Sequence, residues 1–153
     1  MKKVITNTIE ETYELAGDFV DESVRCGFLL CLEGDLGAGK TTFAQGVLKK
    51  FGAEGPYTSP TFNIIKEYDV GKYGIETIYH IDAYRIGSND MELIGWCDIV
   101  NNNKALTIIE WPENVQDILP EDAFVISCEI VNESKRKYNF NGVIARRHDE
   151  AIS

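Results

Sequence analysis

The sequence predicts a single α/β domain over residues 1–153, with a mixed central sheet, flanking helices and a β-hairpin insertion. Three observations favour this fold class. The 153 residues match the commonest size of one domain, and no linker or internal repeat divides them. Segments with helical spacing of apolar residues alternate with continuous apolar runs, as in sheets covered on both faces. Two neighbouring strand candidates are joined by a short glycine-containing turn, which is typical of a hairpin.

The first third of the chain predicts a helix, a buried strand and a second helix. Thr8 followed by Glu11 resembles a capping box, which marks the start of a helix. Its apolar residues recur at steps of three or four: Ile9, Tyr13, Ala16, Val20 and Val24. The run Phe28–Leu32 has the length and composition of a strand that is buried on both faces. A glycine-rich turn follows, and then a helix over about 40–51 with two lysines in its last turn.

The rest of the chain predicts mainly strands. Residues 70–74 contain two glycines and separate two strand candidates, which indicates the hairpin. One buried strand ends at Glu110. In chain order, the predicted elements are a strand pair, a short helix capped by Ser88 or Asn89, the buried strand and a closing antiparallel pair: 62–68, 75–82, 90–94, 105–109, 124–130 and 138–144.

Composition and charge exclude several classes of protein. With 15 Lys and Arg against 25 Asp and Glu, the net charge is −10, so independent binding to a nucleic acid is not expected. No apolar stretch approaches the roughly 18 residues of a membrane helix. The first residues include two lysines but no apolar segment of a secretory signal, so the expected location is the cytoplasm. The four cysteines form no CxxC pair, which argues against a zinc or thioredoxin-like site.

The strongest motif is GDLGAGKT at residues 34–41, a full match to the P-loop pattern G-x-x-x-x-G-K-[ST]. It lies between the first buried strand and the following helix, where successive backbone N–H groups and the helix N-terminus can hold phosphate. The sequence therefore predicts a P-loop NTPase-like domain that binds ATP and Mg²⁺. The expected phosphate-loop residues are Asp35, Leu36, Gly37, Ala38, Gly39, Lys40, Thr41 and Thr42. The carboxylate of Asp35 is expected to face away from the phosphates or to bind a neighbouring donor.

A P-loop enzyme also needs a carboxylate at a strand end to hold the metal and its waters. Glu110 ends the strand over 105–109, with Glu where Asp is commoner, and Trp111 follows it directly. Asp82 ends another strand candidate, within HIDAYR. His80 of the same motif is interpreted as a packed or hydrogen-bonded residue rather than a base. Thr61 lies in TSPTF, which is either a switch-like loop reaching the γ-phosphate or a plain turn before a strand.

Five sequence pieces occur in one order between residues 34 and 113 of this chain: GDLGAGKTTF, SPTF, HIDAYR, ELIG and IEWPE. As an ordered set they resemble the TsaE family, the bacterial P-loop ATPase of tRNA threonylcarbamoyladenosine biosynthesis. The resemblance implies a cytoplasmic, Mg²⁺-dependent ATPase. Slow hydrolysis by the protein alone is expected because the sequence securely places no arginine as an internal finger, although Arg85 and Arg136 could serve if loops deliver them to the γ-phosphate. The implied partners of the ATPase are a threonylcarbamoyl transferase and the inactive paralogue of that enzyme, which modify the adenosine beside the tRNA anticodon. The ATPase supports repeated cycles and meets tRNA only indirectly.

Matched position by position, the resemblance assigns roles to several residues. It implies that Lys40 binds the β- and γ-phosphates and that Thr41 and Glu110 hold Mg²⁺. It places Asp82 in the active site, where this carboxylate positions water. The catalytic set is therefore Lys40, Asp82 and Glu110.

The family also contacts nucleotide outside the P-loop, through its first helix and through an arginine after its late strands. The nearest matches in this sequence are Glu11, or its neighbour Glu10, and Arg136. The resemblance makes Thr61 the switch-like residue, and Trp111 is a candidate because it follows Glu110.

Three other functions compete with this interpretation. A GTPase needs N-K-x-D and D-x-x-G motifs, and neither is present. A small-molecule kinase is the main alternative, although an arginine-rich lid is not evident among the five arginines. A nucleotide-responsive binding module without catalysis is the third. Phosphate release without an added acceptor separates an ATPase from a kinase, and formation of ADP separates either from a binding module.

Overall fold

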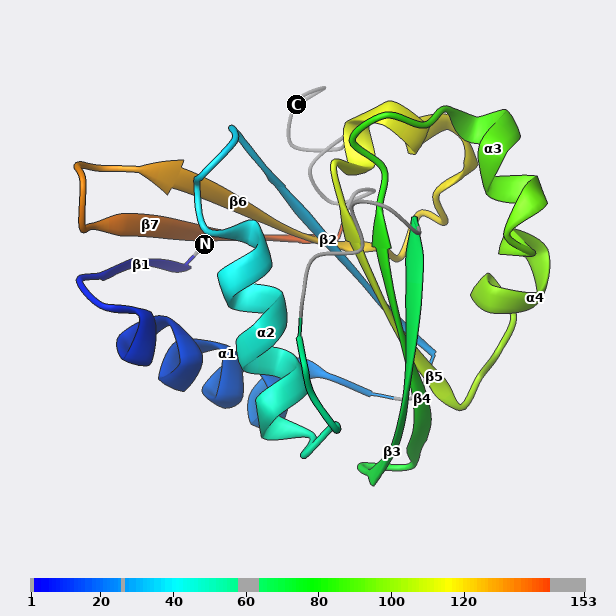
Figure 1. Ribbon diagram of the computed structural model, residues 1–153, viewed down its shortest axis with the longest axis horizontal. Coiled ribbons are helices and arrows are strands. Elements are labelled where there is room, and N and C mark those ends of the chain that lie inside the picture. The colour runs from blue at the N-terminus through cyan, green and yellow to red at the C-terminus, as the bar shows by residue number, and fades with distance from the viewer. Residues whose placement is uncertain (1, 26, 58–63, 144–153) are drawn as a thin grey trace.

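The computed structural model of the protein describes residues 2–25, 27–57 and 64–143. Its centre is a seven-stranded mixed sheet in the order β1-β7-β6-β2-β5-β4-β3, with helices on both faces (Figure 1). The elements are β1 (Lys2–Thr6), α1 (Ile9–Ser23), β2 (Phe28–Gly34), α2 (Lys40–Lys50), β3 (Ile65–Lys72), β4 (Ile75–Asp82), α3 (Ser88–Leu93), α4 (Trp96–Val100), β5 (Ala105–Glu110), the 3₁₀ helix η1 (Pro112–Ile118), β6 (Phe124–Ile130) and β7 (Arg136–Val143). The predicted α/β fold class is confirmed.

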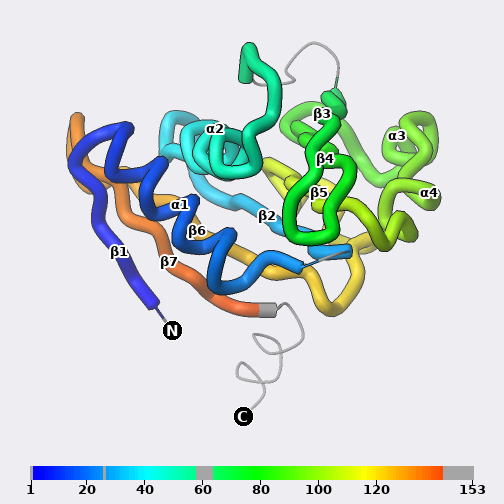
Figure 2. The backbone as a smooth tube through the Cα atoms, turned by 90° about the horizontal axis from the view of Figure 1, so that it is seen from below, coloured from blue at the N-terminus to red at the C-terminus, as the bar shows by residue number. Residues whose placement is uncertain are grey.

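The four middle strands, β6, β2, β5 and β4, are parallel, and the outer pairings are antiparallel. The apolar run of β2 is buried on both faces, as its composition predicts. Leu30 and Leu32 pack into a core with α1 and α2, while Leu29 and Cys31 face a second core with α3, α4 and η1. In Figure 2, α1 and α2 lie together on one side of the view, and α3 and α4 lie together on the other. Among the described residues, no helix is long and apolar enough to cross a membrane.

The parallel strands bring the predicted site residues to one edge of the sheet. β2 runs into the P-loop and α2, and the neighbouring strand β5 ends there at Glu110. In the register of the sheet, Glu110 lies beside Leu32 of β2 and beside Asp82 of β4. The carboxyl ends of three adjacent strands therefore carry the P-loop and both predicted carboxylates, which is where open α/β sheets bind ligands.

Several helix ends differ from the sequence prediction. Thr8 caps α1 by accepting a hydrogen bond from the backbone N–H of Glu11, but the Glu11 carboxylate accepts from the N–H of Asn7 instead of Thr8. Ile9 was expected on the buried face of α1 and is 57% exposed. The helix predicted over 90–94 begins earlier, at Ser88, because Gly87 is its N-cap and donates its N–H to Asp90 at 2.9 Å.

Two strands and one short helix also differ from the sequence prediction. β1 was not predicted, because its short segment KKVIT has three polar residues in five and pairs only with the distant β7. α4 was also not predicted, since five residues carry too little periodicity. The hairpin is tighter than expected: β3 continues to Lys72, and Tyr73 and Gly74 turn with φ of +57° and +76°. The expected beginning of this strand at 62–63 lies outside the described residues.

Candidate functional site

The P-loop passes so close to β6 and β7 that two of its glycines leave no room for a side chain. At Gly34, with φ of +146°, an added Cβ would lie 2.3 Å from the carbonyl oxygen of Cys128. At Gly39, with φ of +102°, it would lie 2.3 Å from the hydroxyl of Tyr138. No described side chain caps the N-terminus of α2, which begins at Lys40. The loop and the uncapped helix start form the arrangement that binds phosphate anions in other proteins.

The side chain of Lys40 is folded against its own loop and is only 5% exposed. Its Nζ donates hydrogen bonds to the carbonyl oxygens of Gly34, at 2.5 Å, and Asp35, at 2.8 Å. The same ammonium lies 4.0 Å from the ring centroid of Trp111, within the range of a cation–π contact. Burial lowers the pKa of Lys40, and the nearby Glu110 carboxylate opposes that shift. The charge is therefore held at the loop by neutral carbonyls and an aromatic face.

Trp111 keeps its position over Lys40 with an unusual backbone. Its φ is +61°, in the left-handed region, and it directly precedes Pro112, where extended backbone is normal. Such a conformation costs about 1–3 kcal/mol and is found mainly where function requires it. The ring of Tyr84 packs against Trp111 with a centroid distance of 4.9 Å. The two aromatic side chains thus form one wall of the site.

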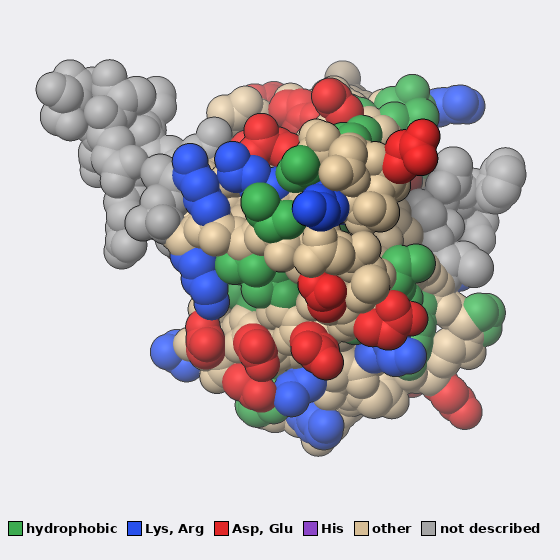
Figure 3. All heavy atoms as spheres, turned by 90° about the vertical axis from the view of Figure 1, so that its left-hand side faces the viewer, with side chains coloured by type: hydrophobic (Ala, Val, Ile, Leu, Met, Phe, Trp, Pro, Cys, Tyr) green, Lys and Arg blue, Asp and Glu red, His purple; other side chains and the backbone are tan. Residues whose placement is uncertain are grey.

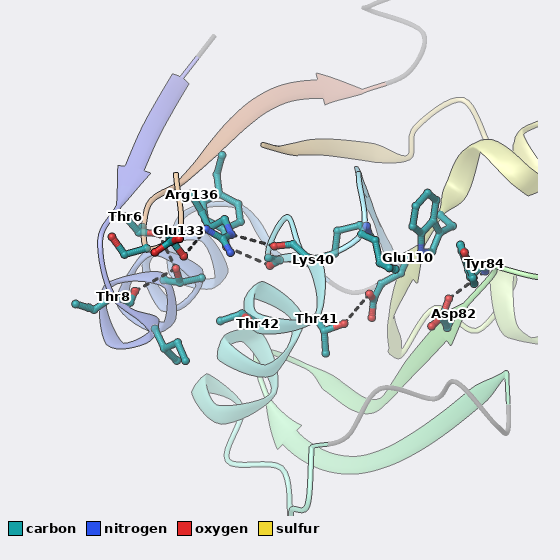
Figure 4. Close-up of a pocket in the computed structure, with 18 of the residues that line it drawn as sticks. Thr6, Thr8, Lys40, Thr41, Thr42, Asp82, Tyr84, Glu110, Glu133 and Arg136 are labelled. Carbon is teal, nitrogen blue, oxygen red and sulfur yellow. Dashed lines mark hydrogen bonds between the residues drawn. The ribbon is translucent and has the colours of Figure 1, made fainter. Parts of the chain in front are cut away.

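Glu110 is the centre of a buried hydrogen-bond chain. Its side chain is held from two sides: Thr41 Oγ1 donates to Oε1 at 2.8 Å, and His80 Nε2 lies 2.6 Å from Oε2. Figure 4 shows Thr41 and Glu110 pointing toward each other across the gap between α2 and β5. Asp82 is half-buried nearby, and its carboxylate accepts the backbone N–H of Tyr84 at 3.0 Å.

These side chains suit Mg²⁺. A hydroxyl and two carboxylates at one sheet edge are the hard oxygen ligands that this ion prefers. Within the described part of the chain, no three His, Cys, Asp or Glu residues gather as a metal cage. Mg²⁺ usually takes only one or two protein ligands and fills the rest with phosphate and water. The donor set therefore fits a metal that arrives with a nucleotide.

A cavity of about 790 Å³ opens over the P-loop, a size typical of small-molecule and cofactor sites. Arg136 borders it and ties the loop to the β6–β7 turn, since Nε donates to the carbonyl of Gly37 at 3.0 Å and Nη1 to that of Asn132 at 2.8 Å. The cavity is lined by the P-loop and the start of α2, together with residues of four other segments: Thr6, Asn7, Thr8, Ile9, Thr12, Asp82, Tyr84, Arg85, Glu110, Trp111, Glu133, Ser134, Arg136 and Tyr138.

Comparison with known proteins identifies the family. The model of the family described as "Threonylcarbamoyl adenosine biosynthesis protein TsaE" matches residues 6–138. The chain belongs to the TsaE family. A relative from Bacillus subtilis, named tRNA threonylcarbamoyladenosine biosynthesis protein TsaE, is 34% identical over 94% of this chain and 88% of its own length. Relatives of the same name from Aquifex aeolicus and Rickettsia felis are 34% and 36% identical, covering 90% and 87% of this chain and 93% and 75% of theirs.

The solved structures include a similar fold. The crystal structure of YdiB from Bacillus subtilis superposes with a TM-score of 0.72 at 26% identity, covering 99% of this chain and 96% of that one.

Most of the residues proposed from the sequence of this TsaE-family protein meet at the cavity. Those that line it are Leu36, Gly37, Gly39, Lys40, Thr41, Thr42, Asp82, Glu110, Trp111 and Arg136. Ala38 is a buried residue of the loop, and Asp35 borders a different cavity. Glu11 is absent from the lining, and its carboxylate accepts hydrogen bonds from the backbone and side chain of Asn7. Thr61 lies outside the described residues.

Other lining residues were missed by sequence reasoning. Tyr84 belongs to HIDAYR, so the motif itself carried a signal, although only Asp82, His80 and Arg85 were selected from it. Thr6 and Tyr138 carried none, because β1 and β7 reach the cavity only through the order of strands in the sheet.

Proposed function

We propose that this protein is a cytoplasmic, Mg²⁺-dependent ATPase that supports threonylcarbamoyl modification of the tRNA adenosine beside the anticodon. Membership of the TsaE family supports the pathway. The observation that carries the ATPase is the cluster of Lys40, Thr41 and Glu110 at the floor of the cavity. It combines a phosphate-binding cation, a metal-binding hydroxyl and a metal-orienting carboxylate, which are the parts that a P-loop enzyme uses.

Each side chain has a distinct task when nucleotide enters. The Lys40 ammonium exchanges its two loop carbonyls for β- and γ-phosphate oxygens, which are stronger acceptors because they are charged. The Thr41 hydroxyl donates a hydrogen bond to Glu110, which leaves the lone pairs of Oγ1 available to a bound Mg²⁺. Asp82 ends the next strand and orients the attacking water. Bound Mg²⁺ supplies positive charge that offsets the charge developing on the phosphate oxygens.

The placement of the two arginines near the cavity is an argument that the protein alone hydrolyses ATP slowly. The guanidinium of Arg136 is held by backbone carbonyls of the P-loop and of the β6–β7 turn, so it braces the loop. Arg85 lies at the rim, is exposed, and is 5.6 Å from the ring of Tyr84. An arginine delivered to the γ-phosphate accelerates hydrolysis by about 10³- to 10⁵-fold in other P-loop enzymes. Partner binding is the proposed event that delivers one or settles Arg85 into place.

The proposed partners are the threonylcarbamoyl transferase and its inactive paralogue. The protein contacts tRNA only through these partners. The net charge of −10 favours a partner with a basic surface. Figure 3 shows acidic side chains gathered across the lower part of one face, where α1 lies. The exposed acidic residues of α1 are Glu10, Glu14, Asp18, Asp21 and Glu22.

The test is the rate of phosphate release with and without the purified transferase pair, at low and moderate salt. We expect slow release by the protein alone, faster release in the complex and a weaker effect as salt screens the contact. Lys40→Ala should abolish the partner-stimulated rate. Equal rates in all mixtures, or release that requires an added small-molecule acceptor, would reject the proposal.

A further inference from the structure

Glu110 is an unusual choice for its position. The side chain is one methylene longer than that of aspartate, so its carboxylate can rotate about one more bond. It is also 2% exposed. A buried carboxylate is costly unless hydrogen-bond donors surround it, and a metal-orienting group must also keep one direction. The longer side chain therefore needs a second anchor besides Thr41.

The sheet register supplies that anchor. His80 pairs with Ile108, and Asp82 pairs with Glu110, so His80 and Glu110 are diagonal neighbours on the same face of two adjacent parallel strands. His80 is 1% exposed, and its Nε2 lies 2.6 Å from Glu110 Oε2. Thr41 holds the other oxygen, so each carboxylate oxygen has its own donor. One donor comes from the helix that follows the P-loop and the other from the sheet.

The geometry also decides which nitrogen of His80 carries the proton. A carboxylate accepts hydrogen bonds, so the proton of this bond is on Nε2. Nδ1 is buried and has no hydrogen-bond partner within the residues that the structure describes. The ring therefore presents its Nε2–H as a single donor aimed at Oε2 of Glu110.

We propose that His80 is a positioning residue for the metal site, which fixes the Glu110 carboxylate so that it orients the water shell of Mg²⁺. The inference rests on the proposed ATPase function. Without the Nε2 donor, Oε2 is buried unpaired, and the carboxylate rotates away from Thr41 or toward the phosphates. Loss of such an outer partner typically lowers metal affinity or activity by about 10- to 100-fold. HIDAYR thus contributes Asp82 to the cavity and His80 to the hydrogen bond that holds Glu110 in place.

Two substitutions separate the hydrogen bond from the bulk of the side chain. In His80→Gln the amide nitrogen lies at the level of Nε2 and can still donate to Glu110. In His80→Asn the amide nitrogen lies at the level of Nδ1 and falls short. Calorimetric titration with the non-hydrolysable analogue AMP-PNP, in Mg²⁺ and in EDTA, gives the factor by which the metal strengthens binding. Thermal melting of both variants without nucleotide records any loss of stability.

We expect His80→Asn to reduce the Mg²⁺ factor by about 10- to 100-fold and to leave binding in EDTA nearly unchanged. His80→Gln should restore most of the factor. Equal loss in both variants, or a wild-type factor in a folded His80→Asn protein, would overturn the proposal. If the wild-type protein itself showed no Mg²⁺ factor, the proposed function would fail and not the His80 contact.

The contact has its own test in the wild-type protein, which also covers variants that fail to fold. The chain has two histidines, and ¹⁵N–¹H correlation spectra report which ring nitrogen is protonated in each. Comparison with His80→Gln, or with a variant lacking His148, assigns the signals. We expect a proton on Nε2 of His80, in the hydrogen bond to Glu110 and protected from exchange with water. An Nε2 without a proton, or a rapidly exchanging ring like that of a surface histidine, would refute the positioning role.

Discussion

Replacing Lys40 by methionine should lower turnover strongly while sparing the fold, because the protein without nucleotide gains little stability from this charge. The ammonium is buried and donates to two neutral carbonyls. Each such bond contributes about 1.5–3 kcal/mol. Against this stands the cost of removing an ammonium from water, which is several kcal/mol. The lowered pKa of Lys40 shows that burial outweighs its partners. The two effects largely cancel, so we expect stability to change by less than about 2 kcal/mol.

The sign of the pH dependence follows from the same pKa. The folded protein binds the Lys40 proton more weakly than the unfolded chain does, so the charge disfavours folding at neutral pH. This penalty is complete below the lowered folded pKa. It is relieved as the pH rises from there toward the ordinary lysine value of 10.5. The stability difference between Lys40→Met and wild type should therefore shift in favour of wild type as the medium becomes alkaline.

The effect on catalysis should be much larger. Losing one preorganised charged contact to the transition state typically costs about 10²- to 10³-fold in turnover, or about 2.7–4 kcal/mol. Lys49→Met is the matched control, since Lys49 lies on the same helix, is exposed and is absent from the cavity. The assay pairs phosphate release with thermal melting, where 2 kcal/mol corresponds to about 4–8 °C. Turnover within tenfold of wild type, or an unfolded Lys40→Met protein beside a folded control, would refute the reasoning.

Three further predictions follow from the site. Glu110→Gln should lower turnover by at least about 100-fold, because an amide offers only one acceptor oxygen to the two donors at this position; wild-type turnover at saturating Mg²⁺ would assign the metal to Asp82. ATP should be preferred over GTP, because the sequence has no guanine-reading N-K-x-D motif; displacement of a fluorescent ATP analogue by GTP as readily as by ATP would contradict this. Gly39→Ala should destabilise the protein by about 1–3 kcal/mol more than Gly52→Ala, since both have positive φ but only Gly39 faces the hydroxyl of Tyr138. Urea unfolding of the two variants measures that difference. Equal midpoints would contradict the prediction and show that the P-loop shifts to make room for the added methyl group.

Local signals made much of the fold predictable. The helix of the P-loop, the buried strand before it and the strand ending at Glu110 all have patterns confined to a few consecutive residues. β1 escaped prediction because its stability comes from pairing with β7, whose residues lie 130 to 138 positions later. The start of α3 was misplaced since Gly87 has no side chain to mark it as a cap, and Asp90 reaches back to supply the bond.

The sequence by itself determined which chemistry is present: a P-loop, a strand-end glutamate and an aspartate in HIDAYR, each defined by neighbours in the chain. Only the tertiary structure decided how these groups touch. The contact between His80 and Glu110 depends on the register of two parallel strands, and Arg136 reaches Gly37 because β7 lies beside β6. Spacing along one strand fixes which face a side chain takes, but not which residue of a neighbouring strand stands opposite. That pairing is set by packing across the whole sheet, where partners lie 30 to 99 residues apart.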